Sequence, residues 1–475
     1  MNALAAQAAP AAAHAALIAP LAGALVAFVV SNFRVAWFFA LAGAFVSVAS
    51  AFLLATFGTS IAPFGLKADA LSFASAPIVA IGGALCVLAA GGLAEEEAGA
   101  RGATLALALV QLSWFGWTGA AFARDFVPLI GFFEAGWIGA CGLVALSAAR
   151  ERAAAPAALR HLASGAAFGI LLALGMALAF NATGSMDFQF AASAHGRTLA
   201  AGIALVCVAL AGAAAAAPLN ATFVHAVDRG GSLAGLLIGG VGVGAMLIVL
   251  MRAALGAHGA GPEVARAVST LVAGLGAASM AIGSVQAMGA QDVRRLAAYA
   301  SAAQAGAVMI ALGVISANGA AAGLMHVAAL GLATIGILGG AAIATRRNAG
   351  DAIDGLGWRA PMAGAAMAAS ALSLIGAPLT VGFATRWRLV EGTIQAGWWW
   401  AAGALIAASL AAVVYAGRIV ERLYLRASAE EARAPSFALA PTHVAVTVAT
   451  IWLGFNASDL WRAALGAGQL LLRAP

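Results

Sequence analysis

The chain has 475 residues, of which 63% are hydrophobic and only 9% are charged, and its mean hydropathy is +0.99. This composition lies far outside the range of soluble globular domains and predicts a polytopic membrane protein. The net charge of +6 does not indicate nucleic-acid binding, because the arginines fall mostly between apolar runs, where they orient helices. The three cysteines lie within apolar runs without paired spacing, which argues against a disulfide framework or a metal site.

Apolar runs long enough to cross a bilayer recur along the chain and predict an all-α fold of about 14 transmembrane helices. The predicted spans are 15–31, 36–57, 74–93, 103–123, 126–148, 160–181, 198–217, 233–251, 268–290, 296–316, 321–344, 361–385, 397–417 and 438–456. No basic segment precedes the first run, so we expect a retained helix and not a cleaved signal peptide.

An even number of spans puts both termini on the same side of the membrane. More of the 24 Lys and Arg residues fall in the loops of the opposite side, which hold Arg150, Arg294, Arg346 and Arg418. Cytoplasmic loops carry an excess of these residues. We therefore expect a multi-pass protein of a bacterial inner membrane with both termini in the periplasm.

A short pattern occurs twice, as APLNATF at 217–223 near the end of the seventh span and as APLTVGF at 377–383 inside the twelfth. Paired Pro- or Gly-interrupted helices in corresponding positions are typical of transporter folds built from structural repeats. We predict that Pro218, Pro378 and Gly382 break helices 7 and 12 in two five-helix repeats, the second inverted because each unit holds an odd number of helices. The simpler alternative is a pair of proline kinks without a chemical role.

This organisation divides the chain into four parts. They are three N-terminal helices (1–102), the first repeat with helices 4–8 (103–256), the second repeat with helices 9–13 (257–425), and a C-terminal helix with a tail (426–475).

Ionisable side chains inside the predicted spans are costly and are candidates for function. Glu134 lies well inside the fifth span, where a carboxyl group can serve as a proton carrier or make a structural hydrogen bond. His326 in the eleventh span and His225 after the first break have the same two alternatives. Arg386 follows the second break and stays protonated, so it can set a field or pair with a carboxylate but can hardly carry a proton.

These features together resemble the proton-conducting antiporter-like subunits shared by NADH:quinone oxidoreductase (complex I), related membrane-bound hydrogenases and Mrp-type cation/proton antiporters. The resemblance covers residues 103–425. It rests on four segments: FFEAGWIGACGLVAL with Glu134, residues 158–185, QDVRRLAAYASAAQAG at 291–306, and LSLIGAPLTVGFATRW at 372–387.

The resemblance implies a 14-helix fold with inverted repeats and a proton path that runs from a helix-5 glutamate, here Glu134, along lysines of helices 7, 8, 11 and 12. The positions of those lysines are occupied here by Ala213, by Gly244 or, in a register shifted by one residue, Val243, by Thr334 and by Arg386. The chain therefore departs from the family pattern, since the first half of the path has lost its cations.

The resemblance implies a proton-translocating subunit that works with other membrane and peripheral subunits, within a lipid bilayer and on protons. No cofactor of its own is expected, because the sequence holds no Cys or His cluster for iron–sulfur or haem ligation, and no redox or hydrolytic centre. Two alternatives stay open. One is a non-pumping scaffold or coupling paralogue, and the other is a stand-alone cation/proton antiporter, which the loss of basic relay residues favours least.

Overall fold

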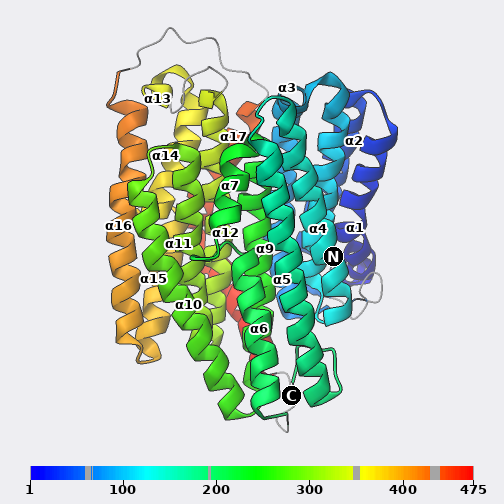
Figure 1. The fold of residues 1–475 in the computed structure, drawn as a ribbon, viewed down its shortest axis with the longest axis vertical. Coiled ribbons are helices and arrows are strands. Elements are labelled where there is room, and N and C mark those ends of the chain that lie inside the picture. The colour runs from blue at the N-terminus through cyan, green and yellow to red at the C-terminus, as the bar shows by residue number, and fades with distance from the viewer. Residues whose placement is uncertain are drawn as a thin grey trace.

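The protein, shown as a computed structural model in Figure 1, is a bundle of helices that run mostly along its long axis. The structure describes residues 2–58, 66, 68–190, 194–345, 353–427 and 439–473. Within these ranges the chain is helical apart from its connections and one isolated bridge between Asp125 and Asp187. Ten of the described helices are long and apolar enough to cross a membrane. The prediction of an all-α polytopic membrane protein is confirmed, whereas the count of fourteen spans and the inverted repeat stay predictions.

The elements follow one another with short connections. The first are α1 (Asn2–Val29), α2 (Phe33–Phe57), α3 (Ala70–Phe122), α4 (Phe126–Leu146), α5 (Ala154–Thr183) and α6 (Arg197–Ala213). The middle ones are α7 (Ala221–Arg229), α8 (Gly231–Leu237), the π-helical η3 (Ile238–Gly242), α9 (Val243–Gly256), α10 (Pro262–Gly289), α11 (Val293–Gly313) and α12 (Ala317–Thr345). The last are α13 (Leu356–Arg359), α14 (Pro361–Ile375), α15 (Val381–Gln395), α16 (Trp399–Tyr424), α17 (Ala440–Phe455) and α18 (Ala457–Arg473).

Although α3 is a single element of 53 residues, it consists of two antiparallel helices. The Ser72 hydroxyl near its start donates to the carbonyl oxygen of Phe122 at its end over 3.0 Å, whereas a straight helix would place these residues about 75 Å apart. The chain turns at Gly99, whose φ of +73° is one that L side chains rarely adopt. The two halves coincide with the predicted spans 74–93 and 103–123.

The centre of the bundle is a fully buried stretch formed by α8, η3 and α9. The sequence did not predict the π-helical turn, whose glycines pack closely against neighbouring helices. Gly240 lies so close to Ile335 of α12 that a Cβ would have no room, and Gly242 lies against the ring of Trp117. Close helix contact of this kind is what small residues permit inside membranes.

Residues 457–473, which the sequence predicted as a tail, form α18. Leu460 and Leu465 pack against the buried core, and the helix contacts α12 and α3. Asp459 and Arg462 pair on its exposed side. Because this polar face lowers the mean hydropathy, a search for continuous apolar runs passes over the helix.

A buried arginine joins α9 to both ends of the α3 hairpin. The Nε and Nη2 atoms of Arg252 donate to the Asp69 carboxylate, each over 3.0 Å, and its Nη1 donates to the carbonyl of Ala123 over 2.9 Å. The two side chains are 2% and 7% exposed. Burial by itself raises the pKa of Asp69, but the charge and hydrogen bonds of Arg252 outweigh it and hold that pKa below its ordinary value of 3.8.

Replacing Asp69 by Asn should therefore destabilise the fold strongly. Removing one partner of a buried ion pair leaves an uncompensated charge and typically costs about 3–5 kcal/mol. The free energy of unfolding of the purified protein at pH 7 measures the effect. Asp459→Asn is the matched control, because its exposed pair with Arg462 should contribute little.

The effect should also depend on pH. A carboxyl group whose pKa is lower in the folded state stabilises the fold above its unfolded pKa, and this contribution disappears as the pH falls through the folded value. The difference in the free energy of unfolding between wild type and Asp69→Asn should hence become smaller below about pH 4. Equal stability of the two proteins at pH 7 would contradict the assigned role of the pair.

Candidate functional site

The chain leaves helical geometry between α6 and α7, at residues 214–220, which include Pro218. A backbone donor freed there finds a partner in the protein. The N–H of Ala217 donates to Oγ of Ser279 on α10 over 2.9 Å, and the Ser279 hydroxyl donates to the carbonyl of Ala302 on α11 over 2.8 Å. Such satisfaction by neighbouring helices is what a break within a bilayer requires.

A second interruption separates α14 from α15. Gly376 ends α14 with a φ of +82°, Pro378 follows, and α15 resumes at Val381. Gly382 lies in the first turn of α15 and not in the break itself. Its N–H donates to Oγ of Ser373 over 3.2 Å, and a side chain at Gly382 would collide with the Ser373 carbonyl. Gly382 therefore allows the chain to return close to the helix that it has just left.

Arg386 of α15 lies beside this second break and is 9% exposed. Its Nη2 donates to the carbonyl of Leu374 at the C-terminal end of α14 and, over 3.0 Å, to Oε1 of Gln304 on α11. Its Nη1 donates to Oγ of Ser409 on α16 over 2.6 Å. Free carbonyls at a helix C-terminus favour a cation, so Arg386 compensates the break while joining four helices.

His326 of α12 is buried in the same place. Its Nε2 lies 3.0 Å from Gln304 Oε1 and its Nδ1 lies 2.9 Å from Thr385 Oγ1, while the Gln304 amide donates to the Tyr415 hydroxyl over 3.2 Å. We call Gln304, His326, Thr385, Arg386 and Tyr415 the His326 cluster. It gathers side chains of α11, α12, α15 and α16 into one hydrogen-bonded group.

The donors and acceptors of the cluster fix the orientation of the imidazole. Arginine can only donate, so the group of Gln304 that faces Arg386 is its carbonyl oxygen. His326 Nε2 must then carry a proton and donate to that oxygen. A neutral His326 accepts from the Thr385 hydroxyl at Nδ1, whereas a protonated one donates to Thr385 Oγ1, whose hydroxyl can turn to the carbonyl of Gly382 at 3.1 Å. The cluster thus accommodates both charge states of His326 by rotation of one hydroxyl group.

A pair of hydroxyl groups extends this polar region along α11. Ser301 lies one helical turn from Gln304, and its Oγ is 3.1 Å from Oγ1 of Thr334 on α12. Thr334 occupies a position where the resemblance implies a lysine. The structure places a neutral, buried hydrogen bond there instead.

Glu134 lies apart from the His326 cluster. It is half-buried on α4, and its Oε1 lies over Gly169 of α5, where a Cβ would come within 2.5 Å. No hydrogen bond or ion pair of this carboxylate occurs within the described ranges of the chain. Ala213, where the resemblance implies its lysine partner, is a buried apolar residue at the end of α6.

His225 is also separate from the cluster. It is exposed on α7, and no polar partner of its ring occurs among the residues that the structure describes. Gly244 lies in buried contact with Val327 of α12. Of the four sequence-predicted pathway residues, the structure brings together only His326 and Arg386.

The structure adds a histidine that the sequence analysis passed over. His161 of α5 is 1% exposed, stacks on Trp137 of α4 at 4.5 Å between ring centroids, and has no partner for either ring nitrogen in the described part of the chain. It lies two helical turns from Gly169, the residue under the Glu134 carboxylate. Buried polar atoms without protein partners commonly hold ordered water.

Gln304, Thr385 and Tyr415 were missed for different reasons. Gln304 could have been found from its position, because an amide in the middle of an apolar span is costly in the same way as Glu134. Hydroxyl groups such as those of Thr385 and Tyr415 are common in membrane helices, so their type gives no signal. Only the fold shows that they face the imidazole and the amide.

Two broken helices with buried ionisable side chains beside one of them define a transporter-like membrane fold. A family model described as "NADH:quinone oxidoreductase/Mrp antiporter, TM" matches residues 123–411, more than half of the chain. The chain belongs to this family. The resemblance inferred from the sequence is thereby confirmed.

Curated relatives agree with this assignment. NADH-quinone oxidoreductase subunit N of Geobacter metallireducens is 30% identical over 365 residues, which cover 73% of this chain and 76% of that protein. Subunit N of Chromohalobacter salexigens is 28% identical over 287 residues, 58% of this chain and 60% of that protein.

Solved structures share the fold. A chain in the Mrp complex from Dietzia sp. superimposes with a TM-score of 0.86 at 18% identity, and 98% of each chain is covered. A chain of respiratory complex I from Thermus thermophilus superimposes with a TM-score of 0.78 at 23% identity, covering 95% of this chain and 99% of that one.

The packing at the second break predicts that Gly376→Ala is destabilising. Alanine is strained at a positive φ, and a Cβ here would lie 2.5 Å from Cδ of Arg386. Gly397→Ala is the matched control, because Gly397 has a similar φ of +76° but nothing within 4 Å of its added Cβ. Unfolding measurements should show Gly376→Ala to be the more destabilising by about 1–3 kcal/mol. If Gly376→Ala and Gly397→Ala lower the free energy of unfolding equally, Arg386 is not packed against the break.

Proposed function

We propose that the chain is a proton-translocating antiporter-like subunit of a complex I-like assembly, of the NADH:quinone oxidoreductase or hydrogenase type. The observation that carries this proposal is the buried His326 cluster beside the break between α14 and α15. Family membership and the subunit N relatives support it. Other membrane and peripheral subunits would provide the redox reaction, and this chain would carry no cofactor.

In the proposed mechanism His326 binds and releases a proton at Nδ1. As the Thr385 hydroxyl passes its proton to Nδ1 of the neutral ring, Oγ1 takes a new proton from a donor on its other side, such as a water molecule. The new hydroxyl then turns to the Gly382 carbonyl, and the charged ring donates to Oγ1. Gln304 keeps Nε2 protonated in both states. The transported proton therefore enters and leaves on the side of the ring that faces the second break.

Arg386 has a positioning role in this mechanism. It stays protonated, so it orients Gln304 and sets a fixed positive charge next to the imidazole. Glu134, half-buried on α4, would exchange protons at a separate place in the first half of the chain.

A non-pumping scaffold or coupling paralogue of the same fold is the second candidate. Specific observations favour it, namely Ala213, Gly244 and Thr334 at positions where the resemblance implies lysines. Such a subunit would assemble with the same partners, and its buried polar groups would serve stability alone. A stand-alone cation/proton antiporter is favoured least, because the relay has lost most of its basic residues.

We also propose the finer organisation of the chain. The parts 1–102, 103–256, 257–425 and 426–475 would be the N-terminal helices, two inverted repeats and a C-terminal region. The end of the bundle that carries α13 would face the cytoplasm of a bacterium, since the last turns of α16, with Arg418, Arg422 and Arg426, lie beside α13 there. Both termini would be periplasmic.

This orientation predicts the activity of reporter fusions. Alkaline phosphatase, which folds only in the periplasm, should be active when it is fused after the C-terminus and inactive when it is fused after Arg150. The reverse pattern of activity would overturn the proposed orientation.

The proton-carrying role of His326 is tested in the whole assembly, reconstituted into vesicles. Thr385→Val should lower proton translocation by this subunit about ten-fold. Removing the hydroxyl leaves Nδ1 of the buried His326 without a hydrogen-bond partner, which costs about 1–3 kcal/mol. Thr385→Ser keeps the hydroxyl and should retain translocation. His326→Gln should abolish this subunit's contribution, whereas His225→Gln, at the exposed histidine, should have no effect. The readout is the number of protons moved per electron pair.

The same assay separates the two candidate functions. Glu134→Gln should also lower the proton-to-electron ratio if the subunit pumps. If Thr385→Val, His326→Gln and Glu134→Gln all leave the ratio unchanged while the assembly stays intact, the subunit is a scaffold.

A further inference from the structure

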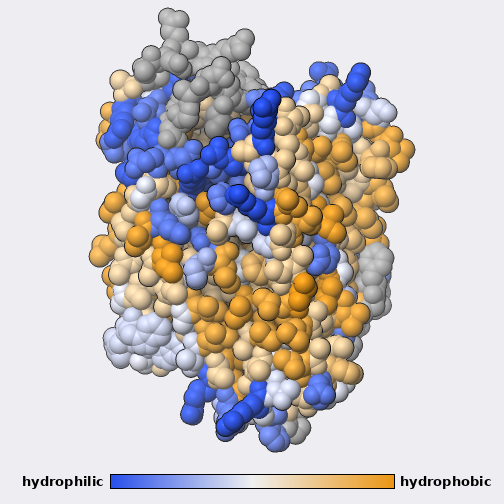
Figure 2. Space-filling model, in the orientation of Figure 1, coloured by the Kyte–Doolittle hydropathy of each residue, from blue (hydrophilic) through white to orange (hydrophobic). Residues whose placement is uncertain are grey.

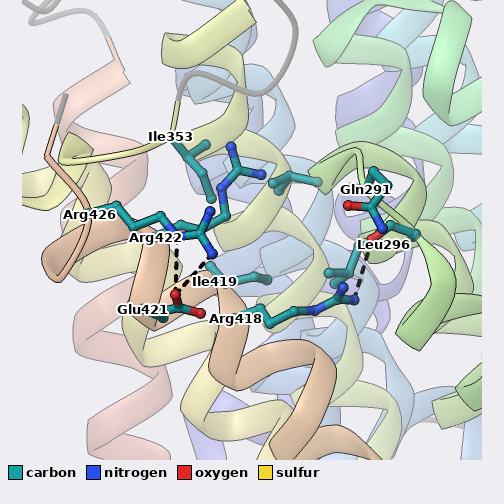
Figure 3. Close-up of a pocket in the computed structure, with 10 residues that line it drawn as sticks. Gln291, Leu296, Ile353, Arg418, Ile419, Glu421, Arg422 and Arg426 are labelled. Atoms are coloured by element: carbon teal, nitrogen blue, oxygen red, sulfur yellow. Dashed lines mark hydrogen bonds and ion pairs between the residues drawn. The ribbon is translucent and has the colours of Figure 1, made fainter. Parts of the chain in front are cut away.

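A cavity of about 270 Å³ lies at the α13 end of the bundle, between the last turns of α16 and the connection from α10 to α11. We call it the α16 pocket. Figure 3 shows Arg418, Arg422 and Arg426 on its α16 side, with Gln291 and Leu296 across from them. The cavity has room for roughly nine water molecules, and hence for a phosphate group with part of its hydration.

The charge of the α16 pocket is positive. Arg422 Nε pairs with Asp354 over 2.6 Å and Arg426 Nη2 pairs with Glu421 over 3.0 Å. Arg418 faces no carboxylate in the described part of the chain. Three arginines thus stand against two carboxylates, which leaves an excess positive charge.

Arg418 also has donor capacity left over. Its Nη2 donates to the carbonyls of Ala287 and Ala290 at the end of α10, over 3.0 and 3.3 Å. Its Nε is buried without a partner in the described ranges. Its Nη1 also has no partner in these ranges but is not buried, so it can donate to an oxygen-rich anion in the pocket.

The surface next to the pocket is apolar. Val414, one turn before Arg418 on α16, and Val285 on the neighbouring α10 are each more than half exposed. Figure 2 shows hydrophilic side chains gathered at this end of the bundle, next to a broad hydrophobic surface. The pocket therefore lies where the headgroup layer of a bilayer meets its hydrocarbon core.

We propose that the α16 pocket binds the phosphate group of an anionic phospholipid, whose acyl chains lie along Val285 and Val414. Guanidinium groups bind phosphate oxygens through paired hydrogen bonds, and basic pockets between membrane helices on the cytoplasmic side suit such headgroups. Free inorganic phosphate presents the same oxygens. The adjacent apolar surface favours a lipid, because free phosphate would leave that surface unused.

Native mass spectrometry of the purified full chain in detergent tests this proposal with defined additions of phosphatidylglycerol, cardiolipin, phosphatidylcholine or inorganic phosphate. The two anionic lipids should be retained in preference to phosphatidylcholine. Arg422→Gln/Arg426→Gln should weaken their retention by about five-fold for each charge removed, since a basic side chain near an anionic surface contributes about 1 kcal/mol.

Two further variants test whether the charge of the pocket arginines, their planar shape, or arginines anywhere on the surface determine lipid retention. Arg422→Lys/Arg426→Lys keeps the charges but removes the planar guanidinium groups. Its retention of anionic lipid should lie between that of wild type and that of Arg422→Gln/Arg426→Gln. Arg150→Gln/Arg152→Gln removes two exposed arginines outside the pocket and should weaken the retention of anionic lipid less than the pocket variant does. Equal unfolding temperatures in lipid-free detergent would show that the variants are folded.

Three outcomes of this experiment support or overturn the proposed lipid site. Selective loss of anionic lipid in the pocket variant supports the proposal. Retention of inorganic phosphate in preference to anionic lipid would keep a phosphate site but overturn the lipid as its occupant. If the pocket variant and wild type retain every addition equally, the proposal is wrong.

Discussion

The absence of water in the bilayer core is the constraint on which the rest of this structure depends. A helix broken there frees backbone donors and carbonyls that only protein groups can satisfy. At the first break a single serine, Ser279, serves the freed N–H of Ala217. At the second break Arg386 serves the carbonyl of Leu374. Polar side chains thus enter the core of the bundle to complete backbone hydrogen bonding, and any further chemistry builds on them.

The His326 cluster follows from that requirement step by step. Arg386 can only donate, so it fixes the amide of Gln304, and Gln304 in turn fixes the protonated nitrogen of His326. The Thr385 hydroxyl has two acceptors within reach, His326 Nδ1 and the Gly382 carbonyl, and can change between them. A group that compensates a broken helix thereby also determines which face of the imidazole exchanges protons.

The sequence predicted the fold class and its interruptions because both depend on local features. Long apolar runs identify spans, and Pro378 lacks the backbone N–H that a helix needs to continue. Gly382, which the sequence also placed in the break, lies in the first turn of α15, and the residue that ends α14 with a positive φ is Gly376. The partners of His326 depend on contacts between distant elements, and no local pattern distinguishes Thr385 from other buried hydroxyls. The π-helical η3 could not be predicted for the same reason, since its backbone depends on the packing of its glycines against α12 and α3. Helix α18 was missed for a different reason, because its polar face lowers its mean hydropathy.

The two halves differ in what their breaks can do. At the first break the Ser279 hydroxyl joins two backbone groups and contacts no ionisable side chain, whereas the second break has an ionisable ring within its hydrogen-bonded group. Between α4 with Glu134 and α12 with His326 lies the stretch α8–η3–α9, whose only polar side chains are Ser232 and Arg252, near its two ends. A proton cannot cross it on side chains. Glu134 and His326 must therefore act in separate paths, or exchange protons through water admitted between the helices.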